Sequence, residues 1–424
     1  MIKDIAIVMR GTLIAQALGF LALPLLTRFF EPATFGNFQL FVSILTLLLV
    51  FPTMRYEVAL LRARTMRELR ALVQLCAMLI VTVSLLFAAF AGLYSWLGWP
   101  RILDALPFSI WLLVLALLFG GMAQFLAILV TRQKAFRTSA RSKILQSTSY
   151  VGTGLAIGAV APFPSGLVVA DLVGRLANSV YLIGWSRRTM PALWKPAPRR
   201  EVVAVARRYR EYPYISVPGT VINVMGGILT PVMIYATFSA MASGQFGLLD
   251  RSVNLPLALV IISVAQVFTA QFSADLARDP VAAAAQFRQV LRYMSLLALA
   301  PMLVLLVAGP WLFALVFGEQ WRLAGELGQI MAPAYAAMLI SGPFHMVLTV
   351  MGRQKLQTAW ELGRLAGVTG LWLLIPRLHL SLKMGVAGYS AIIVLASAVF
   401  LIMAYASMPR RPRPAAVPIH LDVT

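Results

Sequence analysis

Acidic residues are scarce in this sequence of 424 residues. It contains 15 Asp and Glu against 36 Lys and Arg, and charged residues make up only 12% of the chain. Soluble proteins usually carry about 25% charged residues. With 60% hydrophobic residues, a chain of this length lacks the polar side chains to coat a soluble surface. A soluble globular enzyme and a disordered chain are therefore excluded, and a polytopic membrane protein remains.

Cysteine and histidine are nearly absent as well. The single cysteine, Cys76, lies in an apolar run, and the three histidines are scattered without any ligand spacing. The sequence therefore offers no disulfide framework and predicts no metal site. No pair of acids and no nucleophile beside a base stands out. We accordingly expect a protein that is not an enzyme and needs no cofactor.

Long apolar stretches, in contrast, recur along the whole chain. A bilayer core is crossed by about 20 apolar residues in a helix. We predict an all-α polytopic membrane protein with about twelve transmembrane helices. The predicted spans are 5–29, 38–60, 71–98, 108–131, 145–162, 166–186, 213–238, 246–270, 289–316, 328–351, 357–377 and 384–407.

The basic residues identify the side on which the loops lie. Most Lys and Arg fall in segments on the same side as the N-terminus, chiefly 62–70, 132–143 and 187–210. Because such an excess marks the cytoplasmic side, both termini are predicted to be cytoplasmic. These loops suit anionic phospholipid at that face. No loop is long enough to fold a nucleic-acid-binding module, so nucleic acid is not an expected partner.

A weak internal repeat divides the chain. Residues 11–14 (GTLI) recur as 219–222 (GTVI), and residues 36–40 (GNFQL) recur as 244–248 (GQFGL), both at an offset of 208. We therefore predict two six-helix lobes, 1–186 and 213–407, related by a pseudo-two-fold axis along the membrane normal. A basic cytoplasmic loop, 187–212, joins the lobes, and 408–424 forms a cytoplasmic tail. Two lobes that rock about this loop would suit transport by alternating access.

Several motifs resemble one family of transporters. The run from Gly11 to Phe41, the Arg55-Tyr56-Glu57 triplet, and residues 212–227, 244–272 and 317–325 resemble the Wzx-type O-antigen and polysaccharide flippases of the MATE-like MOP superfamily. The resemblance implies a bacterial inner-membrane protein. It would move undecaprenyl-pyrophosphate-linked oligosaccharide to the periplasmic leaflet, for O-antigen, capsule or exopolysaccharide assembly. A polysaccharide polymerase and chain-length components are then candidate partners.

Ionisable residues inside spans are informative because each costs about 2.5–3.5 kcal/mol to insert. Arg10, Arg175 and Arg251 are predicted to line a cleft and bind pyrophosphate, since arginine forms paired hydrogen bonds with phosphate. Alternatives stay open for two of them: Arg10 would reach the headgroups, and Arg175 would form a self-neutralised pair with Asp171 at i, i+4 spacing.

Four further residues, Arg55, Glu57, Asp171 and Asp250, are candidates for a gate or for coupling to a proton or sodium gradient. Arg55 and Glu57 stand two residues apart in the predicted span 38–60. On a continuous helix they would point to different faces, so we expect them not to pair with each other.

Two other functions remain as alternatives. A drug or cation antiporter of the same superfamily should line its cavity with acids, whereas arginines in these spans match or exceed the acids in number. A polysaccharide polymerase or ligase usually carries a large external loop, and the predicted external segments are short hairpins. The sign of the buried charges therefore favours an anionic, lipid-linked substrate.

Overall fold

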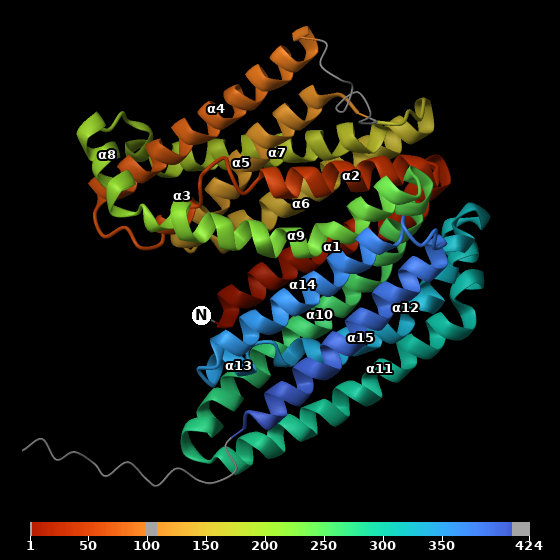
Figure 1. Cartoon of the computed structure of the whole chain (residues 1–424). Helices are drawn as coiled ribbons and strands as arrows, with labels where there is room; N and C mark the ends of the chain where they lie inside the picture. The colour runs from red at the N-terminus through yellow and green to blue at the C-terminus, as the bar shows by residue number, and fades with distance from the viewer. Residues whose placement is uncertain (1, 98–107, 409–424) are drawn as a thin grey trace, which may run out of the picture. The chain divides into compact units, whose positions relative to one another are not determined.

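The computed structural model describes residues 2–97 and 108–408, and every regular element within them is helical (Figure 1). Twelve helices of this part are long. They are α1 (Ile2–Phe29), α2 (Pro32–Leu48), α4 (Met66–Leu97), α5 (Ile110–Arg132), α6 (Phe136–Val160), α7 (Gly166–Thr189), α9 (Val217–Thr237), α10 (Ala240–Arg278), α11 (Pro280–Phe317), α12 (Arg322–Ser341), α14 (Gln354–Leu374) and α15 (Leu382–Ala406).

Eight of these helices are long and apolar enough to cross a membrane, and α1 and α2 add shorter apolar stretches. The remaining two, α6 and α14, carry more polar residues along their length. The all-helical fold class with about twelve membrane helices is confirmed, and the protein is a multi-pass membrane protein.

Two predicted spans are wrong as continuous helices. In place of 38–60, α2 begins at Pro32, ends at Leu48 and is followed by turns and the short α3 (Tyr56–Ala59). In place of 328–351, the chain forms α12, the turn η4 (Gly342–Phe344) and α13 (Val347–Val350). A proline lies at each break, Pro52 and Pro343, and proline cannot donate the backbone hydrogen bond that a continuous helix requires.

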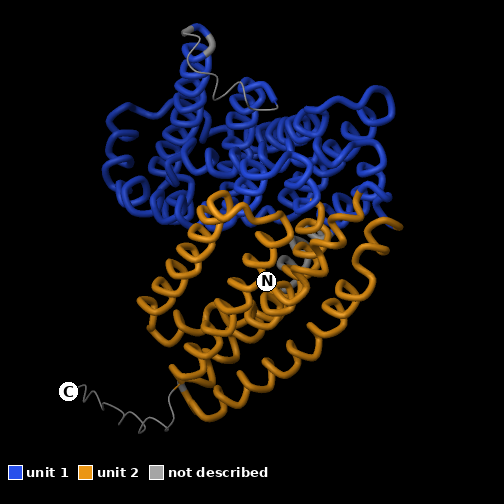
Figure 2. The backbone as a smooth tube through the Cα atoms, turned by 45° about the vertical axis from the view of Figure 1, so that its right-hand side comes forward, with its two compact units in different colours: residues 1–247, 316–320 blue, residues 248–315, 321–424 orange. Residues whose placement is uncertain are grey.

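The chain forms two compact units (Figure 2). Unit 1 comprises residues 1–247 and 316–320, and unit 2 comprises 248–315 and 321–424. The first crossing between units therefore lies inside α10. Segment 187–212, predicted as the joint, belongs to unit 1 and contains the turn η1 (Pro191–Trp194) and helix α8 (Arg199–Arg208). The division into two six-helix lobes, 1–186 and 213–407, stays a prediction.

Within unit 1 the starts of α2 and α10 meet backbone to backbone. A Cβ placed on Gly36 would lie 1.8 Å from the carbonyl oxygen of Ala240, and a Cβ on Gly244 would lie 1.8 Å from that of Pro32. Each pair member is related to its counterpart by the offset of 208 found in the sequence. The contact is thus reciprocal, and it needs glycine on both helices because any side chain would separate the two backbones.

Polar side chains lie on either side of the contact between α2 and α10, at positions that the repeat relates to each other. The Tyr235 hydroxyl donates to Asn37 Oδ1 at 3.1 Å. On the repeat-related side, Gln245 Nε2 donates to the Gln320 carbonyl and Gln320 Nε2 donates to the Thr27 carbonyl, both at 2.7 Å. Thr27 stands where the second repeat has Tyr235, and Gln320 connects it with Gln245.

We predict that Gly36→Ala and Gly244→Ala each destabilise the protein by about 1–3 kcal/mol, because the added methyl group overpacks a backbone contact. Thermal unfolding in detergent measures the effect. Gly152→Ala on α6 is the matched control, since its Cβ would meet nothing within 4 Å. Equal stability of all three variants would show that the crossing is not tightly packed.

Candidate functional site

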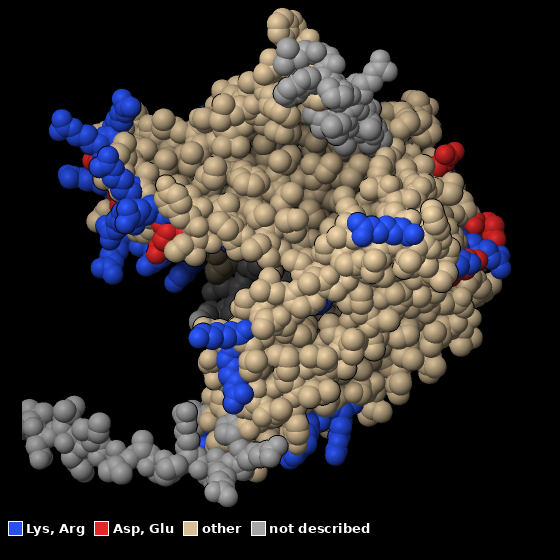
Figure 3. Space-filling model, viewed as in Figure 1, with Lys and Arg blue, Asp and Glu red and all other residues tan. Residues whose placement is uncertain are grey.

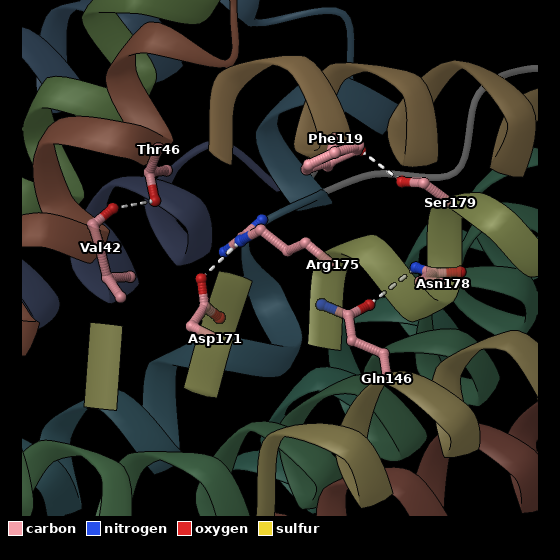
Figure 4. Close-up of polar contacts among 8 residues, drawn as sticks. All are labelled: Val42, Thr46, Phe119, Gln146, Asp171, Arg175, Asn178 and Ser179. Atoms are coloured by element: carbon pink, nitrogen blue, oxygen red, sulfur yellow. Dashed lines mark hydrogen bonds and ion pairs between the residues drawn. The ribbon is translucent and has the colours of Figure 1, made fainter. Parts of the chain in front are cut away.

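An ion pair lies in the interior of unit 1 on α7. Arg175 Nε donates to Asp171 Oδ2 at 2.6 Å, and the two side chains are 18% and 14% exposed. Figure 4 shows the Arg175 guanidinium reaching the Asp171 carboxylate. The predicted i, i+4 pairing is therefore present. Arg175 uses only Nε for it, and its Nη groups have no hydrogen-bond partner among the described residues, so they remain available to an anion.

The same layer carries further polar contacts (Figure 4). Asn178 Nδ2 donates to Gln146 Oε1 at 2.8 Å, and the Ser179 hydroxyl donates to the Phe119 carbonyl at 2.7 Å. Gly120 on α5 makes room for the arginine, because a Cβ there would lie 3.5 Å from Arg175 Nη1. These contacts place Arg175 among polar groups of α5, α6 and α7.

A second charged cluster forms around Glu57, whose side chain is 1% exposed. Its carboxylate accepts from the Thr53 hydroxyl and from Gln124 Nε2 at 3.4 Å, and lies 3.5 Å from Arg55 Nη1. The expectation that Arg55 and Glu57 do not pair is wrong. The helix breaks before them, and Arg55 adopts a left-handed backbone with φ of 64°, which turns its side chain toward Glu57.

The two clusters share one face of α5. Gly120 adjoins Arg175 and Gln124 binds Glu57, and residues at i and i+4 lie one above the other, about 6 Å apart along a helix. Sequence reasoning missed both positions. A lone glutamine and a Gly-Gly pair inside an otherwise apolar span were the available signals.

The third predicted arginine lies on α10 in unit 2. Arg251 is half-buried, and its neighbour Asp250 accepts from Asn254 Nδ2 at 3.3 Å. The structure therefore gives Asp250 a partner one helical turn away. Arg10 lies on α1, and its side chain is outside the described residues.

Arg55 provides a test of the turn before α3. A left-handed backbone costs a residue with a Cβ roughly 1–2 kcal/mol, so Arg55→Gly should unfold at a higher temperature than Arg55→Ala. Both variants lose the contact with Glu57, and only the alanine keeps the strain. At Arg141, exposed inside α6, the order should reverse, because glycine costs about 1 kcal/mol in a helix. The same order at both positions would contradict the strained turn.

Solved structures of membrane transporters share this fold. The inward-closed lipid II flippase MurJ matches with a TM-score of 0.72 at 10% identity, over 95% of this chain and 88% of that chain. An inward-facing multidrug resistance MATE transporter of the MOP superfamily matches with 0.62 at 11% identity, over 92% and 94%. A Vibrio cholerae MATE transporter matches with 0.55 at 14% identity, over 95% and 96%. The fold is therefore that of MOP-type transporters.

A family model places the chain more narrowly. The model described as polysaccharide biosynthesis protein matches residues 25–325, which is more than half of the sequence. The chain belongs to this polysaccharide biosynthesis family. No curated protein matches it by sequence.

Proposed function

We propose that the protein is a flippase that moves undecaprenyl-pyrophosphate-linked oligosaccharide across the bacterial inner membrane by alternating access, for O-antigen, capsule or exopolysaccharide assembly. The observation that carries the proposal is Arg175. It is an arginine held inside a membrane unit by one carboxylate through Nε, with its Nη groups free of described partners. A guanidinium presented in this way can form the paired hydrogen bonds that phosphate accepts.

Membership of the polysaccharide biosynthesis family supports a glycan-related cargo, and the fold likeness to a lipid II flippase fits a lipid-linked one. Arg10 and Arg251 are the other proposed pyrophosphate contacts. Both termini are proposed to face the cytoplasm, where the basic segments would contact anionic phospholipid. Polymerase and chain-length components would receive the translocated product.

A drug or cation antiporter is the competing function, and the fold alone fits it equally well. The described acids of unit 1 argue against it. Asp171 is paired with Arg175, and Glu57 is paired with Arg55 and two hydrogen-bond donors. A cavity for cations needs carboxylates that are not already neutralised, so this interior suits an anionic cargo better.

Coupling to a proton or sodium gradient is part of the proposal. Glu57, Asp171 and Asp250 are the candidate groups, and Arg55 is the candidate gate beside Glu57. Collapsing both gradients in vesicles without any change in transport would remove the coupling.

The anion contacts have a direct test. Arg10→Gln, Arg175→Gln and Arg251→Gln should each slow export about 10- to 100-fold, because a hydrogen bond to a charged group is worth about 1.5–3 kcal/mol. The measurement is the amount of lipid-linked oligosaccharide retained in the cytoplasmic leaflet, at matched protein levels. Arg377→Gln, exposed in the turn after α14, is the control. Full export by all three variants would refute pyrophosphate binding by these arginines.

Asp171→Asn separates the two roles of Arg175. If Arg175 binds the cargo and Asp171 takes no part in coupling, the variant should keep most of its transport, because asparagine can still accept from Nε, whereas loss of transport at an unchanged melting temperature would assign the coupling to Asp171. If the pair serves only structure, Asp171→Asn and Arg175→Gln should lower the melting temperature alike, and the double variant should recover it.

A further inference from the structure

Segment 187–212 is anchored to unit 1 by helix α8. Val202 and Val205 are buried in the core beneath it. The Tyr56 hydroxyl donates to the Ala206 carbonyl at 3.0 Å, and the Ala197 N–H donates to Gln74 Oε1 at 2.6 Å. Both bonds tie the segment to elements more than a hundred residues earlier in the chain. The segment is therefore a fixed part of the unit and not a free loop.

A groove of about 360 Å³ opens between α8 and the start of α4. We call it the basic groove. Figure 3 shows Lys and Arg side chains gathered over this end of unit 1. The basic groove is lined by Arg64, Thr65, Arg67, Glu68, Ala71, Glu201, Ala204, Val205 and Arg208.

Each carboxylate of the basic groove has an arginine beside it, and Glu68 has hydrogen-bond donors as well. Glu68 is 9% exposed and accepts from the Arg64 N–H at 2.8 Å and the Tyr209 hydroxyl at 2.9 Å, with Arg208 Nη1 at 3.2 Å. Glu201 lies 3.8 Å from Arg70 Nη2. Burial, together with the bond to Glu68, raises the pKa of Tyr209 above its ordinary value, so the phenol stays a donor at neutral pH. Glu68 thus links α4 to the residues at the end of α8, and the three arginines that line the groove outnumber its two acids.

Two arginines of the basic groove are not engaged in this way. Arg64 and Arg67 are exposed, and their guanidinium groups have no ion-pair or hydrogen-bond partner among the described residues. They stand on one wall, and Arg208, 61% exposed, stands on the other. Three guanidinium groups around one hollow present the arrangement that a phosphate group requires.

Exposed apolar side chains stand close in sequence to the residues that line the groove. Leu61 is 49% exposed and Met66 is 59% exposed at the α4 side, and Val203 is 41% exposed on α8. In a membrane protein, exposed apolar residues beside basic ones mark a surface that meets the lipid interface. This setting favours a phosphate that belongs to a lipid, whose hydrocarbon chains could contact these apolar side chains.

We propose that the basic groove is a binding site for the phosphate group of an anionic membrane lipid, separate from the transport arginines. The site rests on the proposed membrane orientation, in which this end of unit 1 is cytoplasmic. It does not require that the protein transports anything.

The test is binding of phosphatidylglycerol to the full-length protein in phosphatidylcholine nanodiscs, measured by native mass spectrometry and by the shift in melting temperature. The double variant Arg64→Gln/Arg67→Gln should weaken phosphatidylglycerol binding at least about tenfold, since each lost charged hydrogen bond is worth about 1.5–3 kcal/mol. Arg199→Gln/Arg200→Gln is the matched control. It removes the same charge from exposed positions of α8 that do not line the groove, and should change binding less than twofold.

Three results would overturn the site. Equal weakening by the control pair would indicate a general charge effect, and unchanged binding in the double variant would exclude these arginines. Inorganic pyrophosphate that binds as tightly as phosphatidylglycerol would show that the ligand is soluble. Ala204→Asp, which places a negative charge in the groove at an exposed position, should also weaken binding and guards against misfolding of the double variant. None of these measurements depends on flippase activity, so loss of the site and loss of the proposed function are distinguishable.

Discussion

The close approach of α2 and α10 at Gly36 and Gly244 is the constraint on which unit 1 depends. Inside a membrane, helices gain little from burying apolar surface, because lipid is as apolar as their side chains. Close backbone contact supplies packing energy instead, and it is available only where both helices lack a Cβ. The contact then fixes the spacing that lets Tyr235 reach Asn37 and Gln320 connect Gln245 with Thr27. The polar bonds follow from the glycine contact.

The charged side chains inside unit 1 are neutralised by partners, and space is left beside the Arg175 guanidinium. Glu57 is fully buried, and its partners lie in the turns after α2 and on α5. Asp171 neutralises Arg175 through one nitrogen, with Gly120 leaving space beside the guanidinium. Insertion is thereby less costly for each charge. Both acids have partners, whereas the Nη groups of Arg175 have none among the described residues, and this difference is the basis of the proposed anionic cargo.

The sequence was sufficient to predict the features that depend on composition and on helical periodicity. The helical class, the number of membrane helices and the Asp171–Arg175 pair all follow from apolar length and i, i+4 spacing. It was insufficient where the chain leaves the regular helix. The Arg55–Glu57 pair depends on a left-handed residue after Pro52, and periodicity cannot anticipate such a turn. The roles of Gln124 and Gly120 depend on how α5 packs against its neighbours, which the sequence does not show. Segment 187–212 was predicted as a loop because it is rich in arginine, although the spacing of Val202 and Val205 is typical of a helix.

The repeat and the compact units divide the chain at different places, and the glycine contact explains the difference. By sequence the second copy begins near residue 213, yet unit 1 extends to Gly247. Because the start of α10 packs on α2 through the reciprocal contact and α9 also packs on α2, the first helix of the second copy belongs to unit 1. Segment 187–212 lies in this same unit, where α8 packs against α4, and rocking of the lobes about it stays a prediction. Beyond this contact α10 contains Pro256, which cannot donate a backbone hydrogen bond within the helix, and proline is a common position for a helix to bend.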